Sequence, residues 1–238
     1  RIDLAVHSAK DMPMDFPEGL GIGAALKRGP VEDVIVTKDG TKLVDLKPGS
    51  VVGTGSLRRE LQIRELNPLV VIRPIRGNVQ TRLKKLADGL YDAIVLASAG
   101  LERLDMVSGE EFHFEKLTPA QSLPAAGQAI LAVETKNGHL PEVMAALNDT
   151  EAMAMLRAER AYLKAIGGSC NAPAAALATV DGQKLSMEVM FAQDAKHVKR
   201  ASGSTEHGLL PEQAEALGQK LARKICQGKV WLVGAGPG

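Results

Sequence analysis

The chain has 238 residues, enough for one large domain or for two to three small ones. Hydrophobic residues make up 45% of the chain and charged residues 24%, and this composition excludes a disordered or fibrous protein. The 29 Lys and Arg residues against 28 Asp and Glu residues leave a net charge of +1, which argues against binding to nucleic acid or acidic lipid through bulk charge. No apolar run approaches the roughly 20 residues that span a bilayer, so we expect neither a membrane nor a nucleic-acid partner.

Both ends of the sequence have the pattern of a cut chain. Residues 1–6 already alternate like a strand, with neither an initiator Met nor a signal peptide before them. Residues 229–233 form a second strand-like run, followed only by a glycine-rich turn. We therefore expect an excerpt from a longer protein. Because Cys170 and Cys226 are the only cysteines, we also expect a reducing, cytoplasmic location.

The first half of the chain repeats one order of elements: an apolar strand, a loop with Gly, Ser or Asn, and a helix-like stretch. Strands are predicted at residues 1–6, 50–53, 69–73 and 92–97. Helices are predicted from Leu57, over Val79 to Leu86 and over Leu101 to Leu104. Continuous Val, Ile and Leu runs are typical of strands buried on both faces of a parallel sheet. The alternation of strand and helix predicts an α/β fold.

From about residue 148 the pattern changes. Helix-capping residues at 148–150 precede a helical period that runs to Gly167. Strands are predicted at residues 185–193 and 198–202, and a final helix over residues 211–226 starts with a proline in its first turn. Helix, strands and helix without a βαβ repeat predict a separate small α+β domain.

Arginines gather in the loops that follow the predicted strands. In open α/β sheets ligands bind at the carboxyl ends of the strands, and guanidinium groups pair with carboxylates through two hydrogen bonds. The arrangement therefore indicates a cleft for a ligand with several carboxylates, although arginines in first helical turns are also common on solvated surfaces. The arginines concerned are Arg58, Arg59, Arg76, Arg82 and Arg103.

Two further residues are candidates for chemistry. Asp11 follows Lys10 at the end of the first strand, where a carboxylate could cap a turn or could stabilise positive charge and move a proton. Cys170 lies in a loop with glycines on one side and a proline on the other, which indicates an exposed thiol and leaves both a covalent and a purely structural role open. Cys226 lies within the last predicted helix and is expected to pack. The five histidines show no ligand spacing, so no metal site is expected.

Seven motifs occur in one order and together closely resemble the porphobilinogen deaminase (hydroxymethylbilane synthase) family. The resemblance covers residues 1–227. The motifs are Ala5-Val-His-Ser-Ala-Lys-Asp-Met-Pro13, Gly53-Thr-Gly-Ser-Leu-Arg-Arg59, Arg76-Gly-Asn-Val-Gln-Thr-Arg82, Ala99-Gly-Leu-Glu-Arg103, Leu123-Pro-Ala-Ala-Gly-Gln128, Ala158-Glu-Arg160 and Gly167-Gly-Ser-Cys170.

The resemblance implies three domains, of which the first two are similar to type II periplasmic binding proteins. Residues 1–28 and 122–147 would form the remainder of an incomplete first domain, and residues 29–121 the second, arginine-rich domain. Residues 148–228 would form the α+β third domain. Residues 229–238 resemble the opening of a uroporphyrinogen III methylase, so a fusion of pathway enzymes is expected. Ala126 and Ala129 depart from the Pro and Gly that are frequent in the family.

The resemblance also implies the roles of individual residues. Asp11 would be the catalytic carboxylate, and Cys170 would hold a dipyrromethane cofactor through a thioether. Incoming substrate would be bound by Arg76, Gly77, Asn78 and Arg82. The remaining cofactor-binding residues would be Lys10, Ser8, Thr54, Ser56, Arg58, Arg59 and Arg103.

The implied activity is a transferase of porphyrin and heme biosynthesis. It would deaminate four porphobilinogen molecules, join them head to tail on the dipyrromethane primer and release hydroxymethylbilane, acting as a monomer. Each added pyrrole carries two carboxylates, which matches the density of arginines. A non-catalytic carboxylate-binding module of the periplasmic type is the alternative, but it leaves Asp11 and Cys170 unexplained. A methyltransferase would rest on the last nine residues alone.

Overall fold

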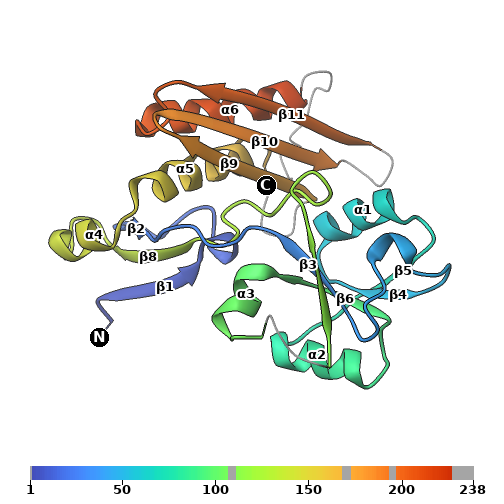
Figure 1. Ribbon diagram of the computed structural model, residues 1–238. Helices are drawn as coiled ribbons and strands as arrows, with labels where there is room; N and C mark the ends of the chain where they lie inside the picture. Colours follow the sequence, from blue (N-terminus) through green and yellow to red (C-terminus); the bar gives the residue numbers. More distant parts are fainter. Residues whose placement is uncertain (1, 107–110, 168–172, 193–196, 227–238) are drawn as a thin grey trace, which may run out of the picture.

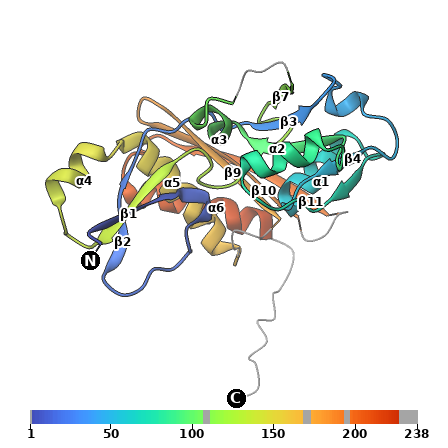
Figure 2. The same cartoon turned by 90° about the horizontal axis from the view of Figure 1, so that it is seen from below.

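The computed structural model describes residues 2–106, 111–167, 173–192 and 197–226, and Cys170 lies outside them. Their strands form three sheets, each with helices packed on it (Figures 1 and 2). The mixed α/β architecture confirms the predicted fold class. The strands of each sheet fall within one of the three predicted domain ranges.

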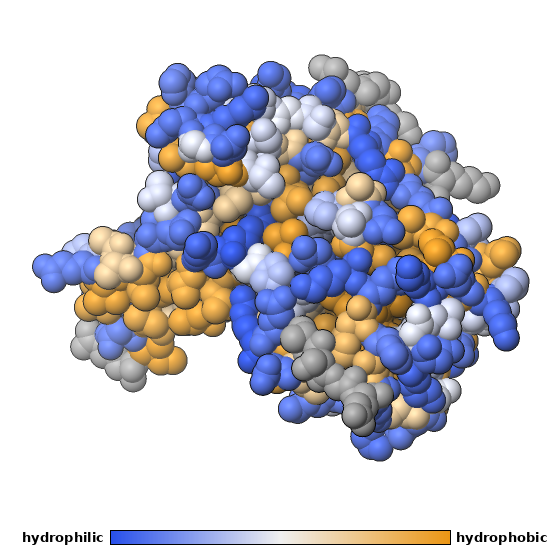
Figure 3. Space-filling view, in the orientation of Figure 1, coloured by the Kyte–Doolittle hydropathy of each residue, from blue (hydrophilic) through white to orange (hydrophobic). Residues whose placement is uncertain are grey.

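The first sheet has the strand order β1-β8-β2 and is antiparallel. Met144 of helix α4 packs on one face against Ala24 and Val133. On the other side, Ala25 and Ala132 belong to the core that the sheet shares with helix α5. The elements are β1 (Leu4–Ser8), the 3-10 helix η1 (Ala9–Asp11), β2 (Leu20–Ala25), β8 (Leu131–Lys136), α4 (Pro141–Leu147) and α5 (Thr150–Ala165). Figure 3 shows apolar residues gathered on the surface over α4, β8 and β1.

The second sheet has the order β5-β4-β6-β3-β7, with α1 on one face and α2 and α3 on the other. Two separate apolar clusters, one on each face, bury its central strands. The elements are β3 (Asp33–Thr37), the 3-10 helix η2 (Leu43–Asp45), β4 (Val51–Gly53), α1 (Leu57–Leu66), β5 (Val71–Arg73), α2 (Val79–Ala87), β6 (Ala93–Ala97), α3 (Ser98–Arg103) and β7 (His113–Leu117).

The prediction of a parallel sheet was right for three of its four strands and wrong for the first strand, and the sheet as a whole is mixed. Strand β4 runs parallel to β5 and β6, but β3 pairs antiparallel with both β6 and β7, and β1 lies in the other sheet. Apolar runs report burial on both faces, whereas strand direction depends on the connections, which composition does not show. The run at 69–73 is an exposed edge, with Val71 46% accessible. Helix α3 begins at Ser98, three residues before the predicted start.

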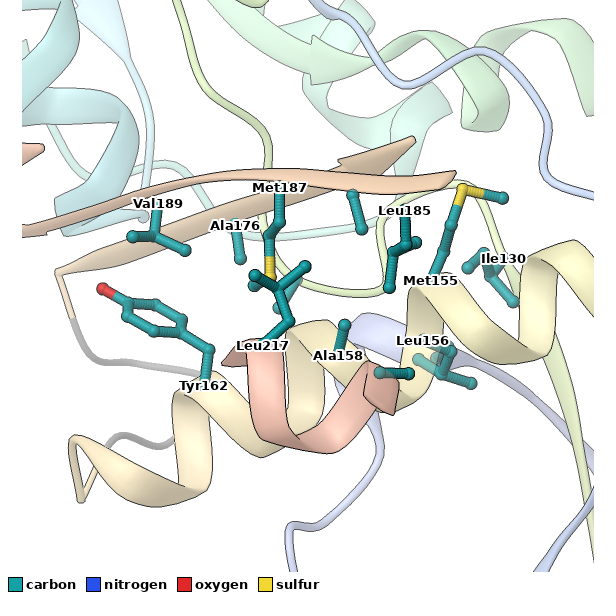
Figure 4. Close-up of a cluster of buried hydrophobic side chains, with 14 of the residues drawn as sticks. Ile130, Met155, Leu156, Ala158, Tyr162, Ala176, Leu185, Met187, Val189 and Leu217 are labelled. Carbon is teal, nitrogen blue, oxygen red and sulfur yellow. The ribbon is translucent and has the colours of Figure 1, made fainter. Parts of the chain in front are cut away.

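The third sheet is an antiparallel meander, β9 (Ala174–Asp181), β10 (Lys184–Ala192) and β11 (Val198–Thr205), covered on one face by α5 and α6 (Pro211–Cys226). Tyr162 and Leu217 point from these helices toward Met187 and Val189 (Figure 4). Helix α6 approaches α5 so closely that a Cβ at Gly218 would lie 2.2 Å from the Ala158 carbonyl oxygen. As predicted, Cys226 packs beside this core.

Candidate functional site

A buried carboxylate binds two of the five predicted arginines, Arg58 and Arg59. Asp33, the first residue of β3, is fully buried and accepts hydrogen bonds from Arg58 Nη1 at 2.7 Å and from Arg59 Nη2 at 2.8 Å. Ser122 Oγ donates to Asp33 at 2.9 Å and Gln128 Nε2 at 3.1 Å. Burial opposes ionisation, but the two guanidinium groups outweigh it and hold the pKa of Asp33 well below its usual range. Asp33 thus fixes both arginines in one orientation.

Helix α1 presents these arginines because of where it begins. Ser56 is its N-cap and accepts a hydrogen bond from the Arg59 backbone N–H at 3.4 Å. The cap places Arg58 and Arg59 in the first turn, where they are only 4% and 8% accessible. Arg58 also donates to the Leu123 carbonyl at 2.7 Å, and Arg59 to the Val95 carbonyl at 3.1 Å. Hydrogen bonds to both the carboxylate and the backbone carbonyls therefore fix the two guanidinium groups.

A cavity of about 390 Å³ lies in front of this cluster. It includes four cationic side chains and Asp11, while Asp33 lies behind two of them. Two carboxylates thus offset two of four positive charges, which leaves a net charge of about +2 toward a ligand. The lining residues are Lys10, Asp11, Gly55, Ser56, Leu57, Arg58, Arg59, Arg76, Ala125, Gln128 and Ala174.

Lys10 and Asp11 reach this cavity because η1 is anchored to the segment before β8. The backbone N–H of Ala9 donates to the Ile130 carbonyl at 2.9 Å. Gly127, with φ +74°, passes so near that a Cβ there would lie 3.0 Å from the backbone nitrogen of Lys10. Ala129 also has a positive φ of 69°, the conformation in which glycine is favoured. The backbone of this segment therefore determines where Asp11 lies.

Burial and the guanidinium of Arg59 lower the pKa of Lys10 to about 8. The ammonium form binds carboxylates and is present below that pH, so we expect carboxylate affinity to fall as the pH rises above 8, by up to about tenfold per unit. Titration with a pyrrole dicarboxylate between pH 7 and 9.5 measures this effect. Arginine stays charged throughout this range, so Lys10→Arg should remove the dependence. A pH-independent affinity in the unsubstituted chain would contradict the prediction that the Lys10 ammonium binds a carboxylate of the ligand.

The predicted substrate loop is ordered by its own side chains. Asn78 caps α2 by accepting from the Thr81 N–H at 2.8 Å, and Gly77 has a φ of +118° that few other residues adopt. Arg82 Nε donates to the Gly77 carbonyl at 2.8 Å. Of this loop, Arg76 lines the cavity, while Gly77, Asn78 and Arg82 do not.

Three further predicted residues also lie outside the cavity lining. Ser8 is in β1, opposite Leu131. Thr54 is buried, and its Oγ1 accepts from the Ser56 N–H at 3.2 Å, so it shapes the turn before α1. Arg103 is the exposed last residue of α3. Their ligand-binding roles stay predictions, as does that of Cys170.

Sequence reasoning missed Asp33 and the function of Gln128. The Nε2 of Gln128 donates to the Val31 carbonyl at 2.7 Å and to Asp33, which fixes the amide orientation. Its Oε1 is buried with no hydrogen-bond partner among the described residues. The only signal was an acid at the start of the apolar run Asp33–Thr37, a strand that the sequence analysis did not predict.

No group of three or more His, Cys, Asp or Glu side chains among the described residues is arranged to hold a metal ion. None of the helices described is both long enough and apolar enough to cross a membrane.

In the comparison with known proteins, models of one family match nearly the whole chain. Residues 1–142 match the family model described as porphobilinogen deaminase, dipyromethane cofactor binding domain. Residues 153–227 match the porphobilinogen deaminase C-terminal domain. The first match contains the cavity residues up to Gln128, and the second contains the Cys170 loop.

Curated relatives carry the same name. Porphobilinogen deaminase of Bordetella parapertussis is 43% identical over 94% of this chain and 70% of its own length. The enzyme of Neisseria meningitidis serogroup B is 43% identical over 99% of this chain and 75% of its own length. That of Thermus thermophilus is 43% identical over 95% of this chain and 74% of its own length.

Solved structures with some likeness include a periplasmic binding protein of Salmonella typhimurium, at 14% identity and a TM-score of 0.35 over 58% of this chain and 59% of that one. Another is a substrate-binding domain of a putative amino acid transporter from Streptococcus pneumoniae, at 16% identity and a TM-score of 0.35 over 62% of this chain and 60% of that one. The family models and the curated relatives, which agree over nearly every residue of the chain, establish that it belongs to the porphobilinogen deaminase family.

Proposed function

We propose that this chain condenses four porphobilinogen molecules head to tail on a dipyrromethane primer and releases hydroxymethylbilane. The observation that carries the proposal is the position of Asp11 on a cavity that also contains Lys10, Arg59 and Arg76. The net positive charge of that cavity favours the carboxylates that both porphobilinogen and dipyrromethane carry. The family match supplies the identity of the substrate and of the primer.

The donor set in the cavity fits dipyrromethane. Arg58 and Arg59 present guanidinium N–H groups that the protein holds rigidly, and Lys10 adds a mobile ammonium, so acetate and propionate groups find fixed and adjustable partners. The Oε1 of Gln128, which finds no partner within the described ranges, is an acceptor suited to a pyrrole N–H. When bound, dipyrromethane supplies the nucleophilic pyrrole carbon. Cys170 is the proposed point of attachment.

Asp11 is the proposed catalytic carboxylate. Loss of ammonia from porphobilinogen develops positive charge on the pyrrole, and a carboxylate beside it stabilises that charge and receives or returns a proton. Lys10 and the arginines hold the carboxylates of the pyrrole and so orient the ring relative to Asp11. Arg76, which lines the cavity without the Asp33 contact, and Arg82 next to it are assigned to the incoming pyrrole.

The test measures ammonia release and bilane formation from porphobilinogen by the purified chain and by an Asp11→Asn variant. The variant keeps the shape of the side chain and loses its charge, so we expect a single-turnover rate lower by about 10²–10³, or 2.7–4 kcal/mol. Asp181→Asn, at an exposed position on β9, is the matched control and should retain the rate. An Asp11→Asn rate within threefold of the unsubstituted chain would reassign Asp11 to a capping role. Carboxylate binding without any ammonia release would instead support a carboxylate-binding module.

A further inference from the structure

A second and larger cavity, of about 670 Å³, lies between the segment after η1 and helices α5 and α6. It shares no lining residue with the cavity that contains Asp11. Figure 2 shows α5 and α6 side by side, and these two helices have an extensive mutual interface. The volume lies in the range of about 300–1,000 Å³ that is typical of small-molecule sites.

The floor of this second cavity is apolar and adaptable. Met14, Phe16 and Ile22 contribute from the N-terminal segment, and Met153 and Leu156 contribute from α5. Methionine side chains are flexible and polarisable, so they adjust to ligands of different shape. A floor of this kind binds a hydrocarbon or aromatic body rather than a hydrated ion.

The rim of the second cavity is cationic. Arg157, Arg160 and Lys164 follow one face of α5, Arg223 faces them from α6, and Glu215 is the acid among the lining residues. Arg160 is already engaged, since it donates to the Pro13 and Met14 carbonyls and lies over the Phe16 ring at 5.3 Å. Lys164 pairs with Asp15 at 2.8 Å.

Arg157 and Arg223 differ from these two cations. Neither side chain forms a hydrogen bond or an ion pair with any residue in the described part of the chain, although both line the cavity. Two unpaired guanidinium groups above an apolar floor are complementary to a ligand with an apolar body and an anionic head. Arg223 is exposed and Arg157 is half-buried, so water solvates both groups in the free chain. A ligand charged throughout would gain nothing from the apolar floor, and a neutral one would gain nothing from the guanidinium groups.

We propose that this second cavity binds an amphipathic carboxylate, with the carboxylate between Arg157 and Arg223 and the apolar body on Met14, Phe16 and Met153. The site is separate from the proposed catalytic cavity, and its occupancy does not depend on catalysis.

The test uses 8-anilinonaphthalene-1-sulfonate as a fluorescent probe and dodecanoate as the carboxylate competitor, on the folded full chain. We expect saturable binding of one probe per chain that dodecanoate displaces. The Arg157→Gln/Arg223→Gln double variant should weaken the probe at least tenfold. Ala165→Leu, which narrows the cavity at an exposed lining position and leaves its charges, should also weaken both ligands.

Two variants serve as matched controls. Lys224→Gln removes a neighbouring exposed cation of α6 that does not line the cavity, and Arg76→Gln removes a cation of the first cavity. Both should keep the dissociation constant within twofold, and circular dichroism should show the same melting temperature for all variants. The proposal would be overturned if the double variant and Ala165→Leu both bound the probe as tightly as the unsubstituted chain, or if Arg76→Gln lost binding.

Discussion

Cys170→Ser should abolish covalent attachment of dipyrromethane and, with it, bilane formation. The serine hydroxyl remains protonated at neutral pH, whereas the thiol ionises readily and its thiolate is a far stronger nucleophile toward an electrophilic pyrrole methylene carbon. Intact-mass measurement of the purified protein reads the result directly, because the adduct adds the mass of two condensed pyrrole units to each chain.

The second cysteine offers a matched control for that experiment. Cys226 lies at the end of α6 and packs beside the core formed by α5, α6 and the third sheet, so Cys226→Ser should keep the adduct. An adduct retained in Cys170→Ser, or lost only in Cys226→Ser, would show that Cys170 is not the point of attachment.

Asp33→Asn should lower the free energy of unfolding by about 3–5 kcal/mol, because it leaves two buried guanidinium groups without their counter-charge. Urea unfolding followed by circular dichroism measures the change. Glu60→Gln breaks the exposed Glu60–Arg64 pair on α1, the helix that carries Arg58 and Arg59, and should cost no more than about 0.5 kcal/mol. The comparison separates the effect of a buried ion pair from that of an exposed one. A loss below 1 kcal/mol for Asp33→Asn would show that the arginines find other partners.

The lowered pKa of Asp33 also predicts how the stability of the folded chain depends on pH. The pKa of Asp33 is lower in the folded chain than the value of about 3.9 of an unfolded one, so its stabilising contribution is complete above about pH 5 and declines as the pH falls through the acid range. In Asp33→Asn this part of the acid sensitivity should disappear.

Local signals predicted α1, α2, α5 and α6, whereas α4 (Pro141–Leu147) was missed. Ser56, Asn78 and Asp149 each accept a backbone hydrogen bond at the start of α1, α2 and α5, since a capping side chain acts within a few residues of itself. Strand β9 was missed because alanine has a low β propensity. Its alanines are selected instead by the closeness of α5, which buries Ala176 and Ala178 completely.

The sequence alone was sufficient for the α/β class and the family, because these depend on short motifs and on apolar periodicity, and the same motifs supplied the residues of the proposed site. Only the tertiary structure decided which of those residues meet. Asp33 pairs with Arg58 and Arg59, which lie 25 and 26 positions away, and Gln128 reaches the same carboxylate from 95 positions away. Such contacts depend on strand order and on the direction of β3, which no local pattern encodes. The second cavity has the same origin, because Phe16 and Arg223 come together only when the N-terminal segment, α5 and α6 pack.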